Sequence, residues 1–263
     1  MGTRKGVILA RGLGKRMRVP SASALTHDQQ KFAELGMKGM IPFGRPFLDY
    51  CISALADAGC TRVCLIIGPE HEAVRDYYSK VEKRRVEIFF SIQQQPLGTA
   101  DAVRAAETFV GPDTFIVVNS DNLYPREPLC ALRKLGASGV IGFEYSALIS
   151  AGMPEERVRS YAVLEVNERD ELVRIVEKPE HMNSNALVSA NCWSLTPNIF
   201  EACSAIAPSV RGELELPTAV QYAIESLDEH FCVIRSRQGV VDLSTRSDIS
   251  QVDQRLQGRT VQL

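Results

Sequence analysis

The sequence predicts an α/β fold in which a Rossmann-like, mainly parallel sheet is flanked by helices and joined by a smaller antiparallel lobe. Residues 1 to about 138 alternate short β-rich runs with helical patterns, which is typical of βαβ units. From about residue 139 the pattern becomes rich in strands. No repeat, low-complexity tract or linker divides the 263 residues. We therefore expect a single domain, 1–263, with two halves at about 1–138 and 139–263.

Short apolar runs in the first half predict parallel strands at Val7–Ala10, Val63–Ile67, Val86–Ile92 and Thr114–Asn119. After the first strand, the apolar positions 47, 48, 51, 52 and 55 follow the spacing of one helical face. Further helices are expected around residues 73–77, at Ala100–Phe109 and at Pro128–Leu135. The segment Ser21–Gln30 is polar and has no period, so we expect a mobile loop there.

The second half predicts a more antiparallel arrangement. Its strands are expected at Val140–Tyr145, Tyr161–Val166, Leu172–Glu177 and Leu187–Ser194. Residues 167–171 are polar and separate two of these strands as a hairpin connection. Helical patterns return around a last strand pair near Phe231–Ile234 and Val240–Leu243. These helices are expected at Pro197–Ile206, Leu216–Leu227 and Ser247–Leu256.

Composition and charge exclude several classes of protein. With 30 basic and 32 acidic residues, the net charge of −2 provides no overall field for gripping a nucleic acid, so we expect no nucleic-acid partner. The seven cysteines are odd in number and lie mostly in apolar runs, which indicates reduced core thiols, and the four histidines have no zinc-binding spacing. The sequence has no signal-peptide-like segment and no apolar stretch of about 18 residues. We therefore expect a cytoplasmic protein that binds no membrane.

The junction Gly6–Arg18 carries the clearest chemical signal. An apolar strand runs directly into a turn with Gly12 and Gly14, followed by Lys15 and Arg16. Glycines let backbone N–H groups approach a polyphosphate, and the basic side chains supply charge to hold it. The spacing excludes a P-loop, which needs Ser or Thr after the lysine, and a dinucleotide fingerprint, which needs glycine at position 17. An ordinary βα turn with solvated basic residues is the alternative.

Polar residues also follow two other predicted strands, at Gln93–Thr99 and Asn119–Asn122. Such sheets place their ligands at the carboxyl ends of the strands, so these segments are expected to join the glycine-rich turn in one site. Asp121 follows an apolar strand, where a carboxylate is costly unless it holds a positive group. The alternatives are a helix N-cap or turn for Asp121 and a solvated turn for the glutamines at 93–95.

Seven motifs follow one another along the chain. They are Leu9–Met17, Lys38–Pro42 with Gly44–Leu48, Gln93–Ala102, Asn119–Asn122, Val176–Pro179, Gly212–Leu216 and Gly239–Thr245. This ordered set closely resembles the sugar-1-phosphate nucleotidyltransferases over residues 6 to about 250. The resemblance implies the nucleotide-diphospho-sugar transferase type of fold. It also implies a nucleotide-binding first half and a sugar-phosphate-binding second half.

The reaction implied by the resemblance is nucleotidyl transfer: a sugar 1-phosphate oxygen attacks the α-phosphorus of an NTP, and pyrophosphate leaves. The attacking phosphate is already anionic near neutral pH, so catalysis depends on alignment and charge neutralisation. Arg16 offers a planar fork suited to the β- and γ-phosphates, and Lys38 offers a point charge near the α-phosphate. The family counterpart of Asp121 binds Mg²⁺, and Asp242 matches the second metal-binding carboxylate. A cap or turn is the alternative for Asp242 too.

The resemblance assigns the remaining site residues. Gln93 has the spacing from Gly98 of the glutamine that reads the nucleobase edge, which favours dTTP or UTP. Glu177 and Lys178 resemble the pair that holds the sugar hydroxyls and the sugar phosphate, with an ordinary surface pair as the alternative. The nucleotide-binding residues are expected to be Leu9, Ala10, Arg11, Gly12, Gly14, Lys15, Gln93, Gly98 and Thr99. The sugar-binding residues are expected to be Glu177, Asn191, Trp193 and Glu213, and Trp193 could equally belong to the core.

Four residues depart from the family pattern. Arg11 stands where the family usually has Ala or Gly near the base, so its side chain must swing aside or contact the base or a phosphate. Lys15, Val240 and Ser244 replace a common Thr, a frequent Trp and a Gly. These departures leave the nucleobase and the sugar open. The alternatives to NDP-sugar synthesis are cytidylyl or guanylyl transfer to another phosphorylated acceptor, a non-catalytic nucleotide-sugar sensor and a metal-dependent glycosyltransferase. A homo-oligomer is also left open.

Overall fold

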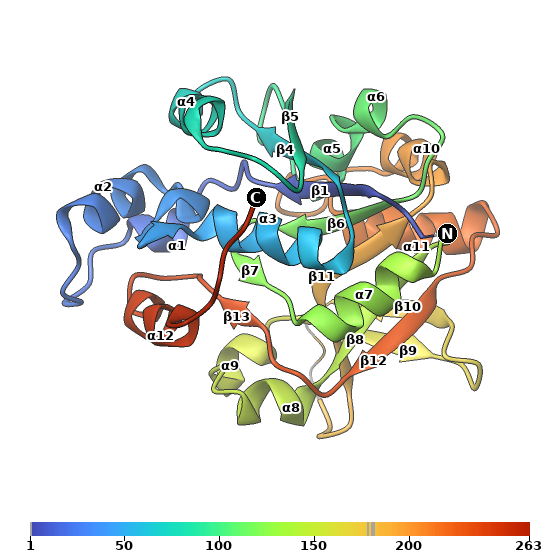
Figure 1. Cartoon of the computed structure of the whole chain (residues 1–263). Coiled ribbons are helices and arrows are strands. Elements are labelled where there is room, and N and C mark those ends of the chain that lie inside the picture. The colour runs from blue at the N-terminus through green and yellow to red at the C-terminus, as the bar shows by residue number, and fades with distance from the viewer. Residues whose placement is uncertain (1, 178, 180–181) are drawn as a thin grey trace.

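A computed structural model describes residues 2–177, 179 and 182–263. At its centre the described residues form a nine-stranded mixed sheet (Figure 1). The main path of this sheet runs through β10 (Leu172–Val176), β9 (Ala162–Val166), β11 (Leu187–Leu195), β6 (Phe115–Asn119), β1 (Lys5–Leu9), β4 (Arg62–Ile67) and β5 (Glu87–Ile92). The strands β8 (Gly139–Glu144) and β12 (Cys232–Ser236) continue the sheet from β11.

The first half of the chain builds the parallel part of the sheet. β1 pairs in parallel with β4 on one side and with β6 on the other, and β5 lies outside β4. The chain therefore moves outward from β1 to β5 and returns to the opposite side of β1 to form β6. In open α/β sheets this change of direction is the topological switch point, where the carboxyl ends of the strands leave a crevice for a ligand.

The second half adds the antiparallel part, as predicted. β11 runs antiparallel to β6, β8 and β9, and β9 pairs antiparallel with β10. These strands continue the central sheet. Both of the last two predicted strands are present, but they do not pair with each other. β12 pairs in parallel with β8, whereas β13 (Val241–Asp242) pairs antiparallel with β7 (Asn122–Leu123) in a separate small sheet. That small sheet connects the second half to the segment directly after β6.

Helices cover both faces of the sheet, and Figure 1 shows α3 and α7 in front of the strands. Residues in β1 alternate between two buried clusters: Ile8 packs with one, and Val7 and Leu9 pack with the other. The helices packed with Ile8 include α3 (Phe47–Ala58), α4 (Glu72–Lys80), α7 (Arg126–Lys134) and α12 (Asp248–Leu256). The helices on the other face include α5 (Thr99–Arg104), α10 (Asn198–Ala205) and α11 (Leu216–Ser226).

Several short helices were not expected from the sequence. Residues 27–30 of the expected mobile loop belong instead to α2 (His27–Leu35), which begins with a capping box between Thr26 and Gln29. The expected helix Ala100–Phe109 is divided into α5 and α6 (Glu107–Val110). The other additions are α1 (Lys15–Arg18), η1 (Lys38–Met40), α8 (Tyr145–Ser150) and α9 (Glu155–Val158), with a two-residue hairpin of β2 (Pro42–Phe43) and β3 (Arg45–Pro46).

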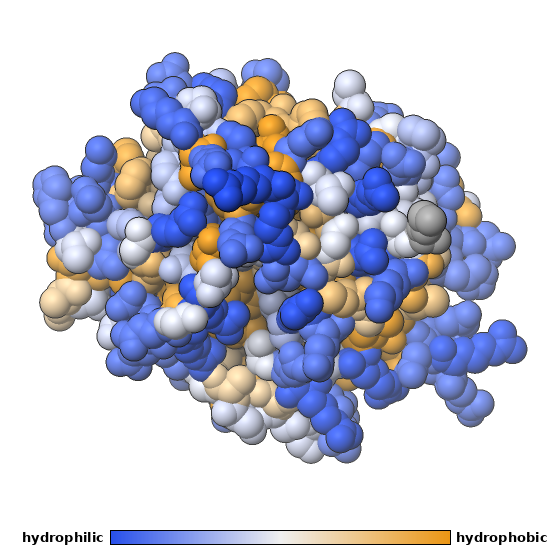
Figure 2. Space-filling model, viewed as in Figure 1, coloured by the Kyte–Doolittle hydropathy of each residue, from blue (hydrophilic) through white to orange (hydrophobic). Residues whose placement is uncertain are grey.

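The surface is mostly polar on the face seen in Figure 2, with apolar side chains in small areas between charged ones. All seven cysteines are free, and five of them are buried, so most of them lie in the core as expected. Among the described residues, no helix has the combined length and apolar character needed to cross a bilayer.

Candidate active site

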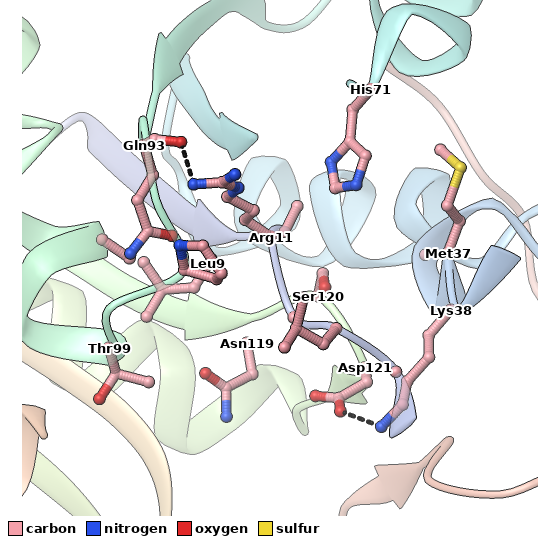
Figure 3. A pocket seen from close by; sticks show the side chains of 18 of the residues that line it. Leu9, Arg11, Met37, Lys38, His71, Gln93, Thr99, Asn119, Ser120 and Asp121 are labelled. Carbon is pink, nitrogen blue, oxygen red and sulfur yellow. Dashed lines mark hydrogen bonds and ion pairs between the residues drawn. The ribbon is translucent and has the colours of Figure 1, made fainter. Parts of the chain in front are cut away.

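A cavity of about 510 Å³ lies at the switch point, at the carboxyl ends of β1 and β6. Figure 3 shows side chains converging on it from the segments after β1, β4, β5 and β6. Thirteen of the predicted site residues line this cavity. They are Leu9, Ala10, Arg11, Gly12, Gly14, Lys15, Arg16, Lys38, Gln93, Gly98, Thr99, Asp121 and Glu213.

The basic loop after β1 forms one end of the cavity. Gly14 has a left-handed backbone (φ 57°), and an added Cβ there would collide with the backbone of Gly36. The chain then enters α1, where Lys15 and Arg16 are exposed and line the cavity. The described structure gives neither side chain a carboxylate partner. Two uncompensated cations at the mouth of a cavity favour an anionic ligand.

Arg246 anchors this basic loop from the other end of the chain. Its buried guanidinium donates from Nε to the carbonyl oxygen of Met17 at 2.9 Å, in the helix that carries Lys15 and Arg16. On the opposite side, Arg18 donates to the carbonyl oxygen of Leu35 at 2.9 Å. Sequence reasoning missed Arg246, because nothing in its local pattern distinguishes it from a surface arginine.

Lys38 and Asp121 meet across the floor of the cavity. Lys38 Nζ lies 2.9 Å from Asp121 Oδ2, and both side chains are partly buried (Figure 3). Lys38 lies in η1, and Asp121 lies between β6 and β7. The tertiary structure therefore joins a lysine and an aspartate that are 83 residues apart in the sequence.

Asp242 lies beside Asp121 because β13 pairs with β7 in a register that places Asp242 opposite Asn122. Asp242 accepts hydrogen bonds from Asn122 Nδ2 at 3.1 Å and from Arg157 Nη1 at 2.8 Å. Burial and the negative charge of Asp121 raise the pKa of Asp242 to about 6, and Arg157 and Lys38 act in the opposite direction. The two carboxylates therefore share one corner, each with a cationic partner, although Asp242 does not itself line the cavity.

Asp121 and Asp242 suit a divalent cation that also takes ligands from a bound phosphate, and not one held by protein side chains alone. Among the described residues, no three or more His, Cys, Asp or Glu side chains are grouped so that they could hold a metal ion. Mg²⁺ commonly takes one or two carboxylates and completes its shell with phosphate oxygens and water. Asp121 and Asp242 are two neighbouring carboxylates and could supply the protein ligands of such a site. Arg157 also bonds Asp248 at 2.9 Å, which holds the segment after Asp242 in place.

The opposite end of the cavity is formed by Gln93 and the segment after it. Gln93 is buried, and its Nε2 donates to the carbonyl oxygen of Gly98 at 3.0 Å and to Asp101 Oδ2 at 2.9 Å. Both neighbours are acceptors, so the orientation of the amide is determined by its surroundings. No described residue donates to Gln93 Oε1, which leaves this oxygen for a ligand. Thr99 Oγ1 accepts from the backbone N–H of Leu216 and so ties this end to α11.

Arg11 and His71 complete this second end. The guanidinium of Arg11 donates to the backbone carbonyl oxygen of Gln93 and to the carboxylate of Glu70. His71 lines the cavity from the segment after β4. Burial lowers the pKa of His71, so its imidazole stays neutral at pH 7. Sequence reasoning identified neither Glu70 nor His71, since no motif marks them.

The site residues predicted from the second half lie less close to the cavity than those from the first half. Glu177 is exposed and comes directly after β10, whose last residue Val176 shares a row with Val163 and Val188. This register brings the end of β10 toward the irregular part of β11 between Ser189 and Trp193. Lys178 is outside the described residues. Among the described second-half residues that were predicted for the site, only Glu213 lines the cavity.

Asn191 and Trp193 share the irregular part of β11, and there the prediction for Trp193 is wrong. Asn191 is half-buried in a left-handed conformation (φ 57°) and accepts a 3.4 Å hydrogen bond from Trp193 Nε1. The side chain of Trp193 is fully buried and packs edge-on against Phe231, on the face of the sheet that carries α10 and α11. A side chain with no exposed surface cannot contact a sugar, so Trp193 is a core residue.

The cavity at the switch point has a cationic end and an amide-lined end, which suits a ligand with a polyphosphate and a base. The chain belongs to the nucleotidyl transferase family, because the model of that family matches residues 5–258. This match confirms the predicted resemblance to the sugar-1-phosphate nucleotidyltransferases and identifies the protein as an enzyme of that family. It also favours nucleotidyl transfer over the glycosyltransferase alternative.

Curated relatives extend the comparison. The chain is 29% identical over 259 residues to the UTP–glucose-1-phosphate uridylyltransferase AglF of Haloferax volcanii, with 98% of both chains covered. It is 31% identical over 222 residues to a glucose-1-phosphate thymidylyltransferase of Streptomyces antibioticus, which covers 84% of this chain and 58% of the relative. A low-salt glycan biosynthesis nucleotidyltransferase of Haloferax volcanii is 30% identical over 234 residues, and the chain spans 59% of its length.

Solved structures of low sequence identity share the fold. A UDP-glucose pyrophosphorylase complexed with UDP-glucose superposes with a TM-score of 0.74 at 20% identity, covering 96% of this chain and 97% of that one. A putative glucose-1-phosphate thymidylyltransferase from Bacillus anthracis gives a TM-score of 0.75 at 20% identity, covering 98% and 97%. These likenesses confirm the predicted fold class.

Proposed function

We propose that the protein joins an NTP to a sugar 1-phosphate, releasing pyrophosphate and forming an NDP-sugar. The observation that carries this proposal is the arrangement of charge in the cavity: Lys15 and Arg16 have no carboxylate partner within the described residues, and Lys38 and Asp121 lie at the same edge of the sheet. A triphosphate laid along this edge would place its β- and γ-phosphates on Arg16 and its α-phosphate near Lys38. Family membership supports the same reaction class.

In this reaction an oxygen of the sugar phosphate forms a new bond to the α-phosphorus, and the bond from that phosphorus to the pyrophosphate oxygen breaks. The nucleophile is already anionic near neutral pH, so the residues of the chain need no general base. Their task is to align the two phosphates and to offset negative charge as it shifts toward the leaving group. Arg16 is suited to the leaving pyrophosphate because a guanidinium binds two phosphate oxygens at once.

We propose Mg²⁺ as the cofactor, held by Asp121 and Asp242. When bound, the ion supplies positive charge at the α-phosphate. Lys38 and Arg157 already contact these two carboxylates and keep them in place. For the acceptor, we propose that Glu177, Asn191 and Glu213 contact the sugar and that Lys178 binds its phosphate. Glu213 lines the cavity and is the best supported of these sugar contacts.

For the nucleobase, we propose a uracil or thymine nucleotide. The amide of Gln93 has both hydrogens engaged by Gly98 and Asp101, so it offers the carbonyl oxygen Oε1, which can accept from the N3–H of these bases. The names of AglF and of the Streptomyces relative point to the same two nucleotides. Seven free thiols support a reducing compartment, and we propose the cytoplasm.

The test is a matrix of five NTPs against a panel of sugar 1-phosphates, with pyrophosphate release measured. We expect release to require both substrates and a divalent cation, and to be fastest with UTP or dTTP. Release only with CTP or GTP and a different phosphorylated acceptor would replace the proposed substrates. Nucleotide-sugar binding without any release would instead indicate a sensor.

A further inference from the structure

Arg11 lines the cavity, but its guanidinium contacts Glu70 and the backbone of Gln93, whereas Lys15 and Arg16 lie in α1. We infer that Arg11 contacts the nucleobase of the bound nucleotide and not its phosphates, and that Glu70 is the residue that positions it. This inference rests on the proposed function only in taking the ligand to be a nucleotide.

The contacts of Arg11 all lie at the Gln93 end of the cavity. Arg11 Nε and Nη2 each lie 3.3 Å from a different carboxylate oxygen of Glu70, so the guanidinium and the carboxylate face each other as two forks. Arg11 Nη1 donates to the backbone carbonyl oxygen of Gln93, as the dashed line in Figure 3 shows. The side chain of Arg11 is only 8% exposed. A side chain held at three points in this way has little freedom to swing toward a phosphate.

The charge of Arg11 is compensated where it lies, unlike that of Lys15 and Arg16. Glu70 offsets the guanidinium, and the neighbouring His71 is neutral at pH 7 because burial lowers its pKa. A polyphosphate is attracted to uncompensated cations, so it should settle on Lys15 and Arg16. A compensated guanidinium keeps two useful properties: a flat face, on which bases stack, and N–H groups that can donate to base carbonyl oxygens.

Glu70 acts on the base through Arg11, and its carboxylate also lies 3.8 Å from His71 Nε2. It is half-exposed and belongs to the segment between β4 and α4, which the sheet places beside the segment after β5. Its carboxylate would repel a phosphate, whereas it holds the arginine plane in one orientation. Arg11 is therefore a contact residue and Glu70 a positioning residue.

The experiment compares the equilibrium binding of UTP with that of inorganic tripolyphosphate, which has no base. For Arg11→Met, we expect the Kd of UTP to rise about tenfold and the Kd of tripolyphosphate to stay within about twofold, since base stacking on a side chain is lost. The matched control is Arg16→Met, which should weaken both ligands. Equal weakening of both ligands by Arg11→Met, or no effect on either, would overturn the inference.

A second variant tests the positioning role and also serves if Arg11→Met does not fold. Glu70→Gln keeps the size of the side chain but frees the guanidinium, so we expect UTP to bind several-fold more weakly and tripolyphosphate to bind equally well or more tightly. In the Arg11→Met background the same change should add nothing, since Glu70 acts through Arg11. A Glu70 effect that persists in that background would overturn the positioning role.

These measurements need no sugar phosphate and no turnover. Base-dependent binding that responds to Arg11→Met, together with absent pyrophosphate release, would remove the proposed reaction and leave this inference standing. If Arg11→Met leaves UTP binding unchanged and pyrophosphate release is normal, this inference is wrong and the proposed reaction stands. A wild-type protein that binds neither UTP nor tripolyphosphate would contradict both.

Discussion

The two halves of the molecule bring side chains to the cavity by different routes. In the first half, parallel strands end at one edge of the sheet, so the segments after β1, β4, β5 and β6 all reach the same cavity. In the second half, β9, β10 and β11 run in alternating directions, and their side chains are divided between two faces and an irregular stretch. Parallel topology concentrates functional groups, whereas antiparallel topology distributes them.

The second half reaches the carboxylate corner through one short strand. β13 places Asp242 beside the segment that carries Asp121, and the following residues include Ser244 at the cavity and Arg246 under α1. The two halves therefore depend on each other where the metal and the phosphates are proposed to bind, and they differ most at the proposed sugar position.

The largest expected effect is on catalysis, when the carboxylate that each half contributes to the proposed metal site is removed. Asp121→Asn and Asp242→Asn should each lower kcat by about 100-fold or more, because each would remove one charged ligand from the proposed Mg²⁺ site. Pyrophosphate release at fixed Mg²⁺, beside a thermal melt, measures this. The matched control is Asp170→Asn, at an exposed ion pair with Arg235, which should leave kcat unchanged. Full activity in either test variant would remove that residue from the site.

The next effect concerns the basic loop of the first half. Arg16→Ala should weaken the transition state by roughly 2–4 kcal/mol, the range for losing one preorganised donor to developing charge. The measurement is kcat/KM for the NTP. Arg18→Ala is the control, because Arg18 belongs to the same helix but bonds the carbonyl oxygen of Leu35 and does not line the cavity. A loss confined to sugar-phosphate affinity would contradict the role given to Arg16.

A smaller effect is expected in the second half. Lys178→Met should lower kcat/KM for the sugar 1-phosphate by roughly tenfold or more and leave the KM for the NTP nearly unchanged, because the stem stays and a charge-assisted contact is lost. Lys80→Met, at an exposed lysine at the end of α4, serves as the control. An unchanged kcat/KM for the acceptor would reject Lys178 as its phosphate ligand and weaken the role of Glu177 with it.

The smallest effect on catalysis is expected at Trp193. Trp193→Phe should lower the free energy of unfolding by roughly 1–3 kcal/mol, because a large buried side chain is shortened. The KM for the sugar 1-phosphate should not change, since the indole lies in the core against Phe231. Denaturant unfolding and steady-state kinetics measure the two quantities. A raised acceptor KM at unchanged stability would return Trp193 to the sugar site.

Local sequence patterns were sufficient to predict an element wherever the residues that define it are adjacent in the chain. The strands of the first half begin and end within a residue or two of their predicted positions, because buried parallel strands are continuous apolar runs. The glycine loop was recognisable because its glycines and basic residues are adjacent in the sequence. The sequence contains a signal for the beginning of α2, because Thr26 and Gln29 form a capping box. We did not predict this helix, because the residues around the capping box are polar.

The sequence by itself determined the βαβ order, the basic loop and the family to which the chain belongs, because each of these depends on residues close together in the chain or on the order of motifs. Only the tertiary structure decided which charges meet. Glu70 compensates Arg11, Arg157 contacts Asp242, and Arg246 bonds Met17 in α1, across 59, 85 and 229 positions respectively. Coulomb interactions depend on distance in space, and no local pattern contains the distances that the packed sheet creates.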